Sequence, residues 1–190
     1  MILTIHQPNF MPWYPFFQKM EMADTFVVMG HCQFEKNGFQ NRFNINNQWQ
    51  TMSVFKGLDD IVDKKYANHK RDWTKLKKRL YHYSSILDNF DDIIDKNEGN
   101  LFETNYEIIV KLRDMLGINT EIVKDFPSNL TSSDRLAEIC SYYGATHYIS
   151  GVSGKKYLDI DPFEQSKITI SFQESSSMIK KHTLEILNDR

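Results

Sequence analysis

Cysteine is scarce in this 190-residue sequence, which contains only Cys32 and Cys140. Two cysteines cannot build a disulfide framework, and these two lack the spacing of metal-binding pairs. Long apolar runs are also absent, since none approaches the roughly 20 residues that cross a bilayer. Residues 1–6 lack the basic segment and long apolar stretch of a signal peptide. We therefore expect a cytoplasmic protein without a membrane segment, in which neither cysteine needs a redox role.

An excess of charge is lacking too, because 23 Lys and Arg residues face 25 Asp and Glu residues, a formal net charge of −2. Proteins that bind nucleic acid by neutralising phosphates usually show a strong basic excess. The one basic run, from Lys64 to Arg79, could hold a nucleotide-sugar diphosphate or a nucleic-acid backbone. A solvated helix face is the commoner explanation. Four aspartates between positions 88 and 95 partly neutralise the run, which argues against a nucleic-acid partner.

Apolar residues are plentiful, at 41% of the sequence with 13 Phe and 9 Tyr. This is enough for a core, and the length fits one domain of ordinary size. We predict a single domain over residues 1–190, with a helical insertion at about 60–116.

The first thirty residues have the pattern of an α/β protein. Ile2–Ile5 is a short apolar run that ends in the turn-forming segment His6–Asn9. Pro12 and Pro15 precede a short apolar stripe, as proline does at the start of a helix. Thr25–Met29 is rich in β-branched and aromatic residues and predicts a buried strand. Strand, loop, helix and strand in this order build parallel sheets.

The rest of the sequence predicts a hairpin, then helices, then a return of the α/β rhythm. Arg42–Ile45 and Trp49–Val54 flank Asn46-Asn47, as in a hairpin. Helical spacing runs from Asp60 to Leu116, with Asn105 as the odd polar member of an apolar stripe closed by Gly117. Further strands are expected at Thr120–Val123, Thr146–Ser150 and Lys167–Phe172. One helix is expected to begin after a capping Thr131 hydroxyl and to place Cys140 in the core. A last helix is expected at Met178–Leu187. The predicted fold is α/β: a mainly parallel open sheet with helices on both faces.

Two loops follow strands of this predicted sheet, one at His6–Asn9 and the other at Gly151–Lys156. Ligands of open α/β sheets bind beyond the carboxyl ends of the strands. The two loops could therefore face one crevice, which makes them the candidate site.

Several segments resemble the WbqC-like family. They are Ile5–Trp13 (IHQPNFMPW), Ala23–Val28 (ADTFVV), Gln33-Phe34, Asn41-Arg42, Gly144–Gly151 (GATHYISG) and Ser153–Asp159 (SGKKYLD). The similarity runs over roughly residues 1–172. The His-Gln-Pro-Asn motif is its most specific part.

The resemblance implies a function in bacterial surface-polysaccharide biosynthesis. Members are associated with such gene clusters, and some are labelled glycine transferases, which implies acyl transfer to an amino sugar. Gly30 and His31 stand where the family pattern leads us to expect two aspartates, so no role of those aspartates carries over. The family's aromatic-proline-glutamine stretch is also missing from the final segment.

His6 is the candidate general base, because the ordinary pKa of histidine lies near neutrality; it could instead cap the strand end. The Gln7 and Asn9 amides suit an acyl or sugar substrate, or they stabilise the turn. Arg42, beside Asn41, could clamp a phosphate or carboxylate, or pair with a surface acid. The match to the family motif favours the functional interpretation of each.

Ser153, Gly154 and Lys155 belong to a glycine-serine loop whose backbone N–H groups could bind an anion. The spacing is not that of a Walker motif, and a plain turn with solvated lysines is the alternative. No metal site is expected: His31 and Cys32 are adjacent, so on a strand they would point to opposite faces.

Three functions fit these features. The favoured one is a transferase that places an acyl or aminoacyl group on an activated amino sugar, with a nucleotide sugar and an acyl donor as small-molecule partners. The second is an ATP-using nucleotidyl-transfer or adenylate-forming enzyme. The third is a non-catalytic module that binds a glycan or a nucleic acid through Trp13, Trp49 and Trp73. The sequence identifies neither a cofactor nor an oligomeric state.

Overall fold

The computed structural model describes all residues, 1–190, and the chain divides into two compact units. We name them the sheet unit and the helical unit. The sheet unit comprises Met1–His6, Pro15–Met29 and Asn119–Ile179. The helical unit comprises Gln7–Tyr14, Gly30–Ile118 and Lys180–Arg190. Each unit is therefore built from three stretches of chain. The prediction of a single domain stays a prediction.

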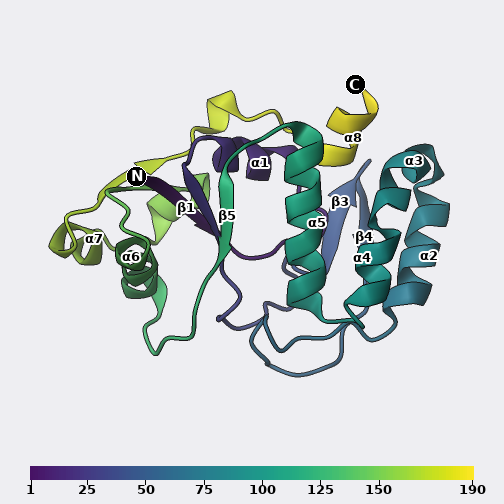
Figure 1. The fold of residues 1–190 in the computed structure, drawn as a ribbon, viewed down its shortest axis with the longest axis horizontal. Helices are drawn as coiled ribbons and strands as arrows, with labels where there is room; N and C mark the ends of the chain where they lie inside the picture. The colour runs from purple at the N-terminus through teal and green to yellow at the C-terminus, as the bar shows by residue number, and fades with distance from the viewer. The chain divides into compact units, whose positions relative to one another are not determined.

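The sheet unit contains a five-stranded, fully parallel sheet (Figure 1). Its strand order is β5-β2-β1-β6-β7. The strands are β1 (Ile2–His6), β2 (Thr25–Val28), β5 (Glu121–Lys124), β6 (His147–Ser150) and β7 (Thr169–Phe172), and the helices are α1 (Tyr14–Glu21), α6 (Ser132–Tyr142) and α7 (Asp161–Gln165). The predicted α/β fold with a parallel sheet is confirmed.

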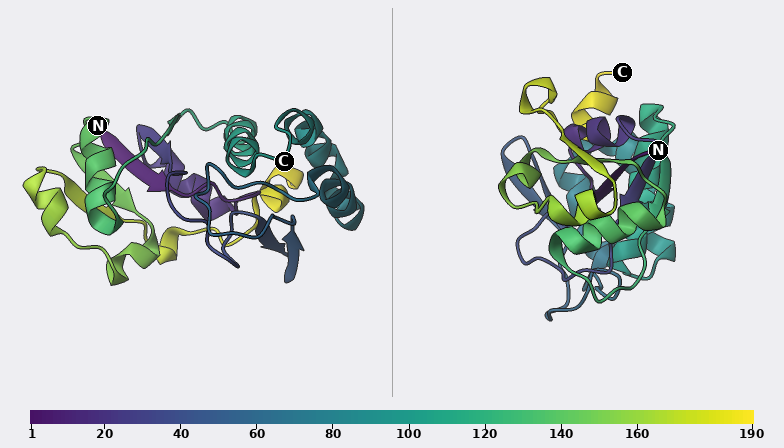
Figure 2. Two further views of the ribbon diagram at one scale, coloured as in Figure 1. Left: turned by 90° about the horizontal axis from the view of Figure 1, so that it is seen from below. Right: turned by 90° about the vertical axis from the view of Figure 1, so that its left-hand side faces the viewer.

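Helices cover both faces of this sheet. Side chains alternate along each strand, so successive residues contact helices on opposite faces. Leu3 and Ile5 of β1 pack against Ile139 and Cys140 of α6 in one buried cluster. On the other face, Phe26 of β2 meets Phe16 of α1 with ring centroids 5.0 Å apart. Figure 2 shows the sheet unit from two further sides, with α6 in green. Successive residues of β1 and β2 are buried because both faces of the sheet are covered, which explains the continuous apolar runs in the sequence.

The helical unit contains a β-hairpin and a set of helices. The hairpin joins β3 (Arg42–Ile45) to β4 (Gln48–Thr51) in antiparallel register, with Phe43 opposite Gln50. Asn46 and Asn47 both have positive φ, which is the geometry of a tight two-residue hairpin turn. The helices are α2 (His69–Arg79), α3 (Ser84–Leu87), α4 (Asp91–Lys96), α5 (Leu101–Leu116) and α8 (Thr183–Asn188).

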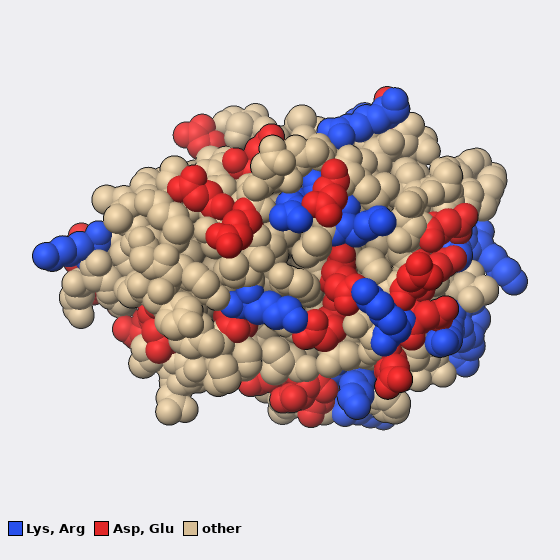
Figure 3. Space-filling view, in the orientation of Figure 1, with Lys and Arg blue, Asp and Glu red and all other residues tan.

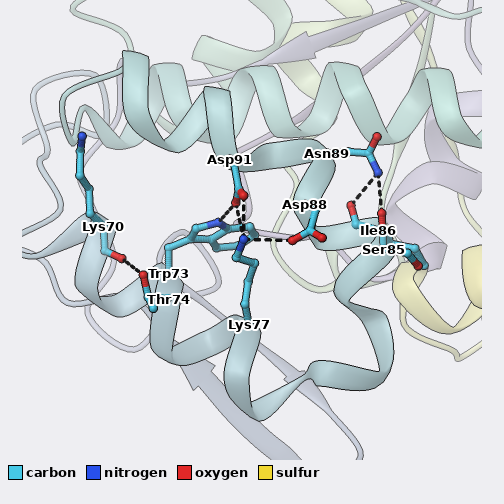
Figure 4. Close-up of polar contacts among 9 residues, drawn as sticks. All are labelled: Lys70, Trp73, Thr74, Lys77, Ser85, Ile86, Asp88, Asn89 and Asp91. Atoms are coloured by element: carbon cyan, nitrogen blue, oxygen red, sulfur yellow. Dashed lines mark hydrogen bonds and ion pairs between the residues drawn. The ribbon is translucent and has the colours of Figure 1, made fainter.

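Two of the six basic residues of α2, Lys70 and Lys77, pair with the aspartates that follow this helix. Lys77 Nζ lies 3.0 Å from Asp88 and 2.7 Å from Asp91, and Trp73 also donates to Asp91 (Figure 4). Lys70 pairs with Asp95 at 3.1 Å. In the space-filling view, basic and acidic side chains lie among one another over these helices (Figure 3). The partial neutralisation that the sequence predicted is therefore seen at these two lysines.

Three local predictions were wrong. The terminal helix begins at Thr183, not at Met178, because the His182 ring accepts from the Leu184 N–H and caps the helix there. Helical structure begins at His69, not at Asp60, since residues 60–68 make turns and isolated bridges. The Thr131 side chain makes no capping hydrogen bond at α6. In contrast, Gly117 closes α5 with φ of 75°, as predicted. None of the helices combines the length and the hydropathy that a bilayer-crossing segment requires.

Candidate functional site

The strand order places the two predicted loops side by side on the sheet. The chain runs from β1 outward to β2 and β5, then returns to place β6 on the other side of β1. The order therefore reverses between β1 and β6, and ligands of open parallel sheets bind beyond the strand ends at such a switch point. His6 ends β1, and Gly151 follows β6. Both predicted loops thus leave the carboxyl edge of the sheet at its switch point.

His6 lies half-buried on the face of the sheet that α1 covers. Its ring meets the ring of Phe16 edge-on, with centroids 4.8 Å apart. Its backbone carbonyl accepts from the Met29 N–H at 2.9 Å, which continues the pairing of β1 with β2. One side of the imidazole is therefore covered by an aromatic ring.

Lys19 is an unexpected neighbour of this strand end. It is on α1, it is almost fully buried, and its ammonium donates to the Ile5 carbonyl at 2.9 Å. Burial lowers the pKa of Lys19 from 10.5 to about 7. No carboxylate is paired with it, and the Phe26 ring lies 6.0 Å away. Sequence reasoning missed this residue, although its place three residues after Phe16 puts it in the apolar stripe of α1.

The loop after β6 is a 3-10 turn, η3 (Val152–Lys156), rather than an open loop. Ser153 and Lys155 are exposed, and the Lys155 ammonium lies 5.6 Å from the centre of the Phe172 ring. Phe172 is two residues after Ile170, so alternation directs it to the face covered by α6, opposite to His6. The structure thus brings the two loops to one edge but points these two side chains to different faces.

Gly154 is needed for the close packing of η3. A Cβ atom at this position would lie 2.1 Å from the Ser150 Oγ and 3.1 Å from Leu158. The Gly154 N–H donates to the Gly151 carbonyl, so it is occupied within the turn. The predicted anion-binding role of Ser153, Gly154 and Lys155 stays a prediction.

A second charged group lies at the same edge of the sheet, and sequence reasoning missed it. Asp125 follows β5, and its carboxylate pairs with buried Arg135 of α6 at 3.2 Å. Arg135 also pairs with Glu138 at 2.6 Å and lies over the Phe126 ring. The signal was present, because Asp125 lies two residues after the strand predicted at Thr120–Val123. The pair ties α6 to the end of β5.

Gln7 and Asn9 belong to the helical unit, where hydrogen bonds anchor the turn that contains them. The Gln7 amide oxygen accepts from Gln40 at 2.5 Å, and its nitrogen donates to the Cys32 sulfur at 3.5 Å. The Pro8 carbonyl accepts from Asn105 at 2.7 Å. Asn9 is buried, and its N–H donates to the Gln7 carbonyl. These contacts fit the turn-stabilising alternative; a contact of either amide with substrate stays a prediction.

The same segment is held further along by the last helix. His182 bonds the Met11 carbonyl at 2.9 Å, and the Thr183 hydroxyl donates to the Pro12 carbonyl at 2.6 Å. Burial lowers the pKa of His182 to about 4, so the ring is neutral near pH 7. Its Nδ1 accepts from the Leu184 N–H, so its Nε2 carries the proton that Met11 accepts. Residues 7–14 are thus fixed by segments far away in the sequence.

Asn41 and Arg42 lie at the start of β3 in the helical unit. The Asn41 side chain donates to the Met52 carbonyl at 2.7 Å, across the hairpin. Arg42 donates to the carbonyls of Asn37 and Gly38, and its guanidinium lies 4.1 Å from the centre of the Trp49 ring. Arg42 therefore bonds backbone carbonyls rather than the surface acid considered as its alternative partner. A phosphate clamp by Arg42 stays a prediction.

Comparison with known proteins decides the family. The model of the WbqC-like protein family matches residues 7–182. The chain belongs to the WbqC-like family. A curated relative, the uncharacterized protein Rv1507c of Mycobacterium tuberculosis (strain ATCC 25618 / H37Rv), is 26% identical over 186 residues, covering 90% of this chain and 80% of that protein. No solved structure matches.

One departure from the expected WbqC-like pattern has a steric explanation. At Gly30, a Cβ atom would lie 2.3 and 2.4 Å from two ring atoms of Phe102 and 2.7 Å from Val62. The aspartate that we expected here has no room unless the Phe102 ring moves. Glycine at position 30 therefore allows α5, through Phe102, to pack closely against this segment.

We predict that Gly30→Ala destabilises the protein by about 1–3 kcal/mol, because overpacking a close contact costs this much. Urea unfolding followed by circular dichroism measures the change. Gly151→Ala is the control, because a Cβ there meets nothing within 4 Å and its φ is −66°. In the background Phe102→Leu the cost of Gly30→Ala should shrink. Equal effects of the two alanine substitutions would contradict the steric explanation.

The two cysteines and His31 form no site of their own. Cys140 is fully buried in the cluster beneath α6, as predicted, and burial raises the pKa of its thiol to about 12. Residues 31 and 32 lie in a bend rather than on a strand. No cluster of three or more His, Cys, Asp or Glu side chains is placed to hold a metal ion.

Proposed function

We propose that this WbqC-like protein is a transferase that places an acyl or aminoacyl group on the amine of an activated amino sugar, in bacterial surface-polysaccharide biosynthesis. The single observation that carries the proposal is the position of His6. It ends β1 at the switch point of a parallel sheet, beside the strand that leads into η3.

His6 would act as the general base and then as the general acid. The sugar amine attacks the carbonyl carbon of the donor, and the new C–N bond forms as His6 accepts the proton from that nitrogen. The bond from the carbonyl carbon to the leaving atom then breaks, and His6 returns the proton to that atom. A thioester, an acyl phosphate or an aminoacyl ester balances this scheme. The products are an amide and the protonated leaving group.

The surroundings of His6 support this assignment. The edge-on contact with Phe16 covers one side of the ring and restrains its rotation, and the residue is half-buried. The Lys19 ammonium donates to the carbonyl of Ile5, the residue before His6, and so restrains the end of β1. A catalytic base must be held in a defined orientation, and these contacts restrain the imidazole at the strand end.

We expect purified protein to acylate a nucleotide-linked amino sugar, and His6→Ala to lower kcat/KM by about 10²–10⁴-fold. Panels of nucleotide-amino sugars are incubated with acyl thioesters and aminoacyl donors, and mass spectrometry detects the added acyl mass. If no combination gives product, or if His6→Ala keeps the wild-type rate, the proposal is wrong.

The matched control is His147→Gln. His147 is half-buried in the same sheet but begins β6, at the amino-terminal edge, where it bonds Ser171 at 2.7 Å and Thr169 at 2.9 Å. This substitution should leave kcat/KM within about twofold of wild type, because ligands bind at the opposite edge.

A further inference from the structure

A pocket of about 320 Å³ lies within the helical unit, beside the β3–β4 hairpin, and Phe34 and Val54 form part of its lining. Arg42 and Thr51 line it from paired positions on the two strands. Lys36, Asn37 and Asn41 line it from the segment before β3. The volume is at the lower end of the range for small-molecule sites, roughly 300–1,000 Å³. It suits a group of the size of one or two phosphates.

The pocket carries positive charge without a balancing acid. Its lining contains the Lys36 ammonium and the Arg42 guanidinium and no carboxylate. Lys36 is exposed and forms no ion pair. The Arg42 guanidinium is held in place by two hydrogen bonds: its Nε donates to the Gly38 carbonyl and its Nη2 donates to the Asn37 carbonyl. A guanidinium that is already fixed loses little freedom when it binds an anion.

Flat side chains continue from the pocket along the outer face of the hairpin. Arg42 and Trp49 are diagonal neighbours across the two strands, on the face that alternation turns outward, with the guanidinium 4.1 Å from the ring centre. The Phe39 ring lies 5.7 Å from that of Trp49. Trp49 is 46% exposed and Phe39 is 53% exposed. Exposed aromatic rings beside a cation are typical of surfaces on which bases stack.

We propose that this pocket and the adjoining rings bind a nucleoside diphosphate, with the phosphates at Lys36 and Arg42 and the base on Trp49 and Phe39. The cations and the rings are adjacent, as the phosphate and the base are in a nucleotide, and neither feature alone would select that ligand. The assignment of this nucleotide as the carrier of the activated sugar rests on the proposed function. Binding of the nucleotide to the pocket can be tested without turnover.

The test is a titration of the wild-type protein with UDP, dTDP, GDP and ADP at physiological salt, followed by tryptophan fluorescence and calorimetry. At least one nucleotide should bind saturably below about 1 mM, the upper end of ordinary substrate affinities. Trp49→Leu and Lys36→Met should each weaken it about tenfold, the scale of one lost stacking or charge contact. Uridine and inorganic phosphate, tested separately, should bind more weakly than UDP.

Two control variants match the exposure of the changed residues. Trp13 is 44% exposed, so Trp13→Leu should leave the affinity unchanged, as should Lys180→Met at an exposed lysine outside the pocket. His6→Ala should also bind nucleotide normally, which separates this site from the transfer reaction. The inference is overturned if no nucleotide binds, or if Trp49→Leu and Lys36→Met bind as tightly as the controls.

Discussion

Replacing Lys19 by Met should stabilise the protein by about 3 kcal/mol at pH 7. Removal of the buried ammonium, whose pKa is lowered from 10.5 to about 7, contributes about 4 kcal/mol of stabilisation. Met fills a similar volume along α1 without a charge. The loss is one hydrogen bond to the Ile5 carbonyl, worth about 1 kcal/mol, which the relief of desolvation exceeds.

The pH dependence gives the sharper test. The unfolded chain keeps Lys19 protonated up to about pH 10.5, while the folded protein releases the proton near pH 7. Between these values the unfolded state binds more protons, so stability rises as the pH increases. We expect the wild-type free energy of unfolding to increase by about 2 kcal/mol from pH 7 to pH 9, and that of Lys19→Met to stay flat.

Other shifted groups titrate outside this window. The pKa of His182 is lowered to about 4, so its effect lies between that value and 6.5. The pKa of Cys140 is raised from 9.0 to about 12, so its effect begins above pH 9. Lys156→Met, at an exposed lysine of the sheet unit, should keep the wild-type slope. A wild-type slope that persists in Lys19→Met would show that another group is responsible.

Replacing Asn105 by Ala should destabilise the protein by about 3 kcal/mol or more. Asn105 is fully buried on α5 and serves three partners at 2.7 Å each: it donates to the Pro8 and Gln40 carbonyls and accepts from the Tyr66 hydroxyl. Alanine leaves all three groups in the interior without this partner, and each buried unsatisfied group costs about 1–3 kcal/mol. Urea unfolding measures the loss.

Asn89 provides the matched control. Its amide also makes two hydrogen bonds, to the Ser85 and Ile86 carbonyls, but the residue is exposed, so water can replace them (Figure 4). Asn89→Ala should cost less than about 1 kcal/mol. Asn105→Ala should also speed hydrogen exchange at the Phe10 amide, which bonds the Phe39 carbonyl in the anchored turn. Similar losses for both asparagines would contradict the role of Asn105.

The sequence predicted local structure well where a local rule decides it. Asn46-Asn47 predicted the hairpin because asparagine tolerates the positive φ that a tight turn requires. Gly117 predicted the end of α5 for the same reason. It failed where distant contacts decide, as at α8, whose start is set by the His182 ring and its bond to Met11. Nothing within residues 178–187 reveals that partner.

The candidate site divides in the same way. From the sequence came His6 at a strand end, the glycine-serine loop after another strand, and Asn105 as an odd polar residue in an apolar stripe. Only the tertiary structure placed β1 beside β6, buried Lys19 below the Ile5 carbonyl and gave Asn105 its three partners. The physical reason is that backbone preferences and the period of apolar residues act over a few positions. Strand neighbours and buried polar contacts depend on how residues a hundred positions apart pack together.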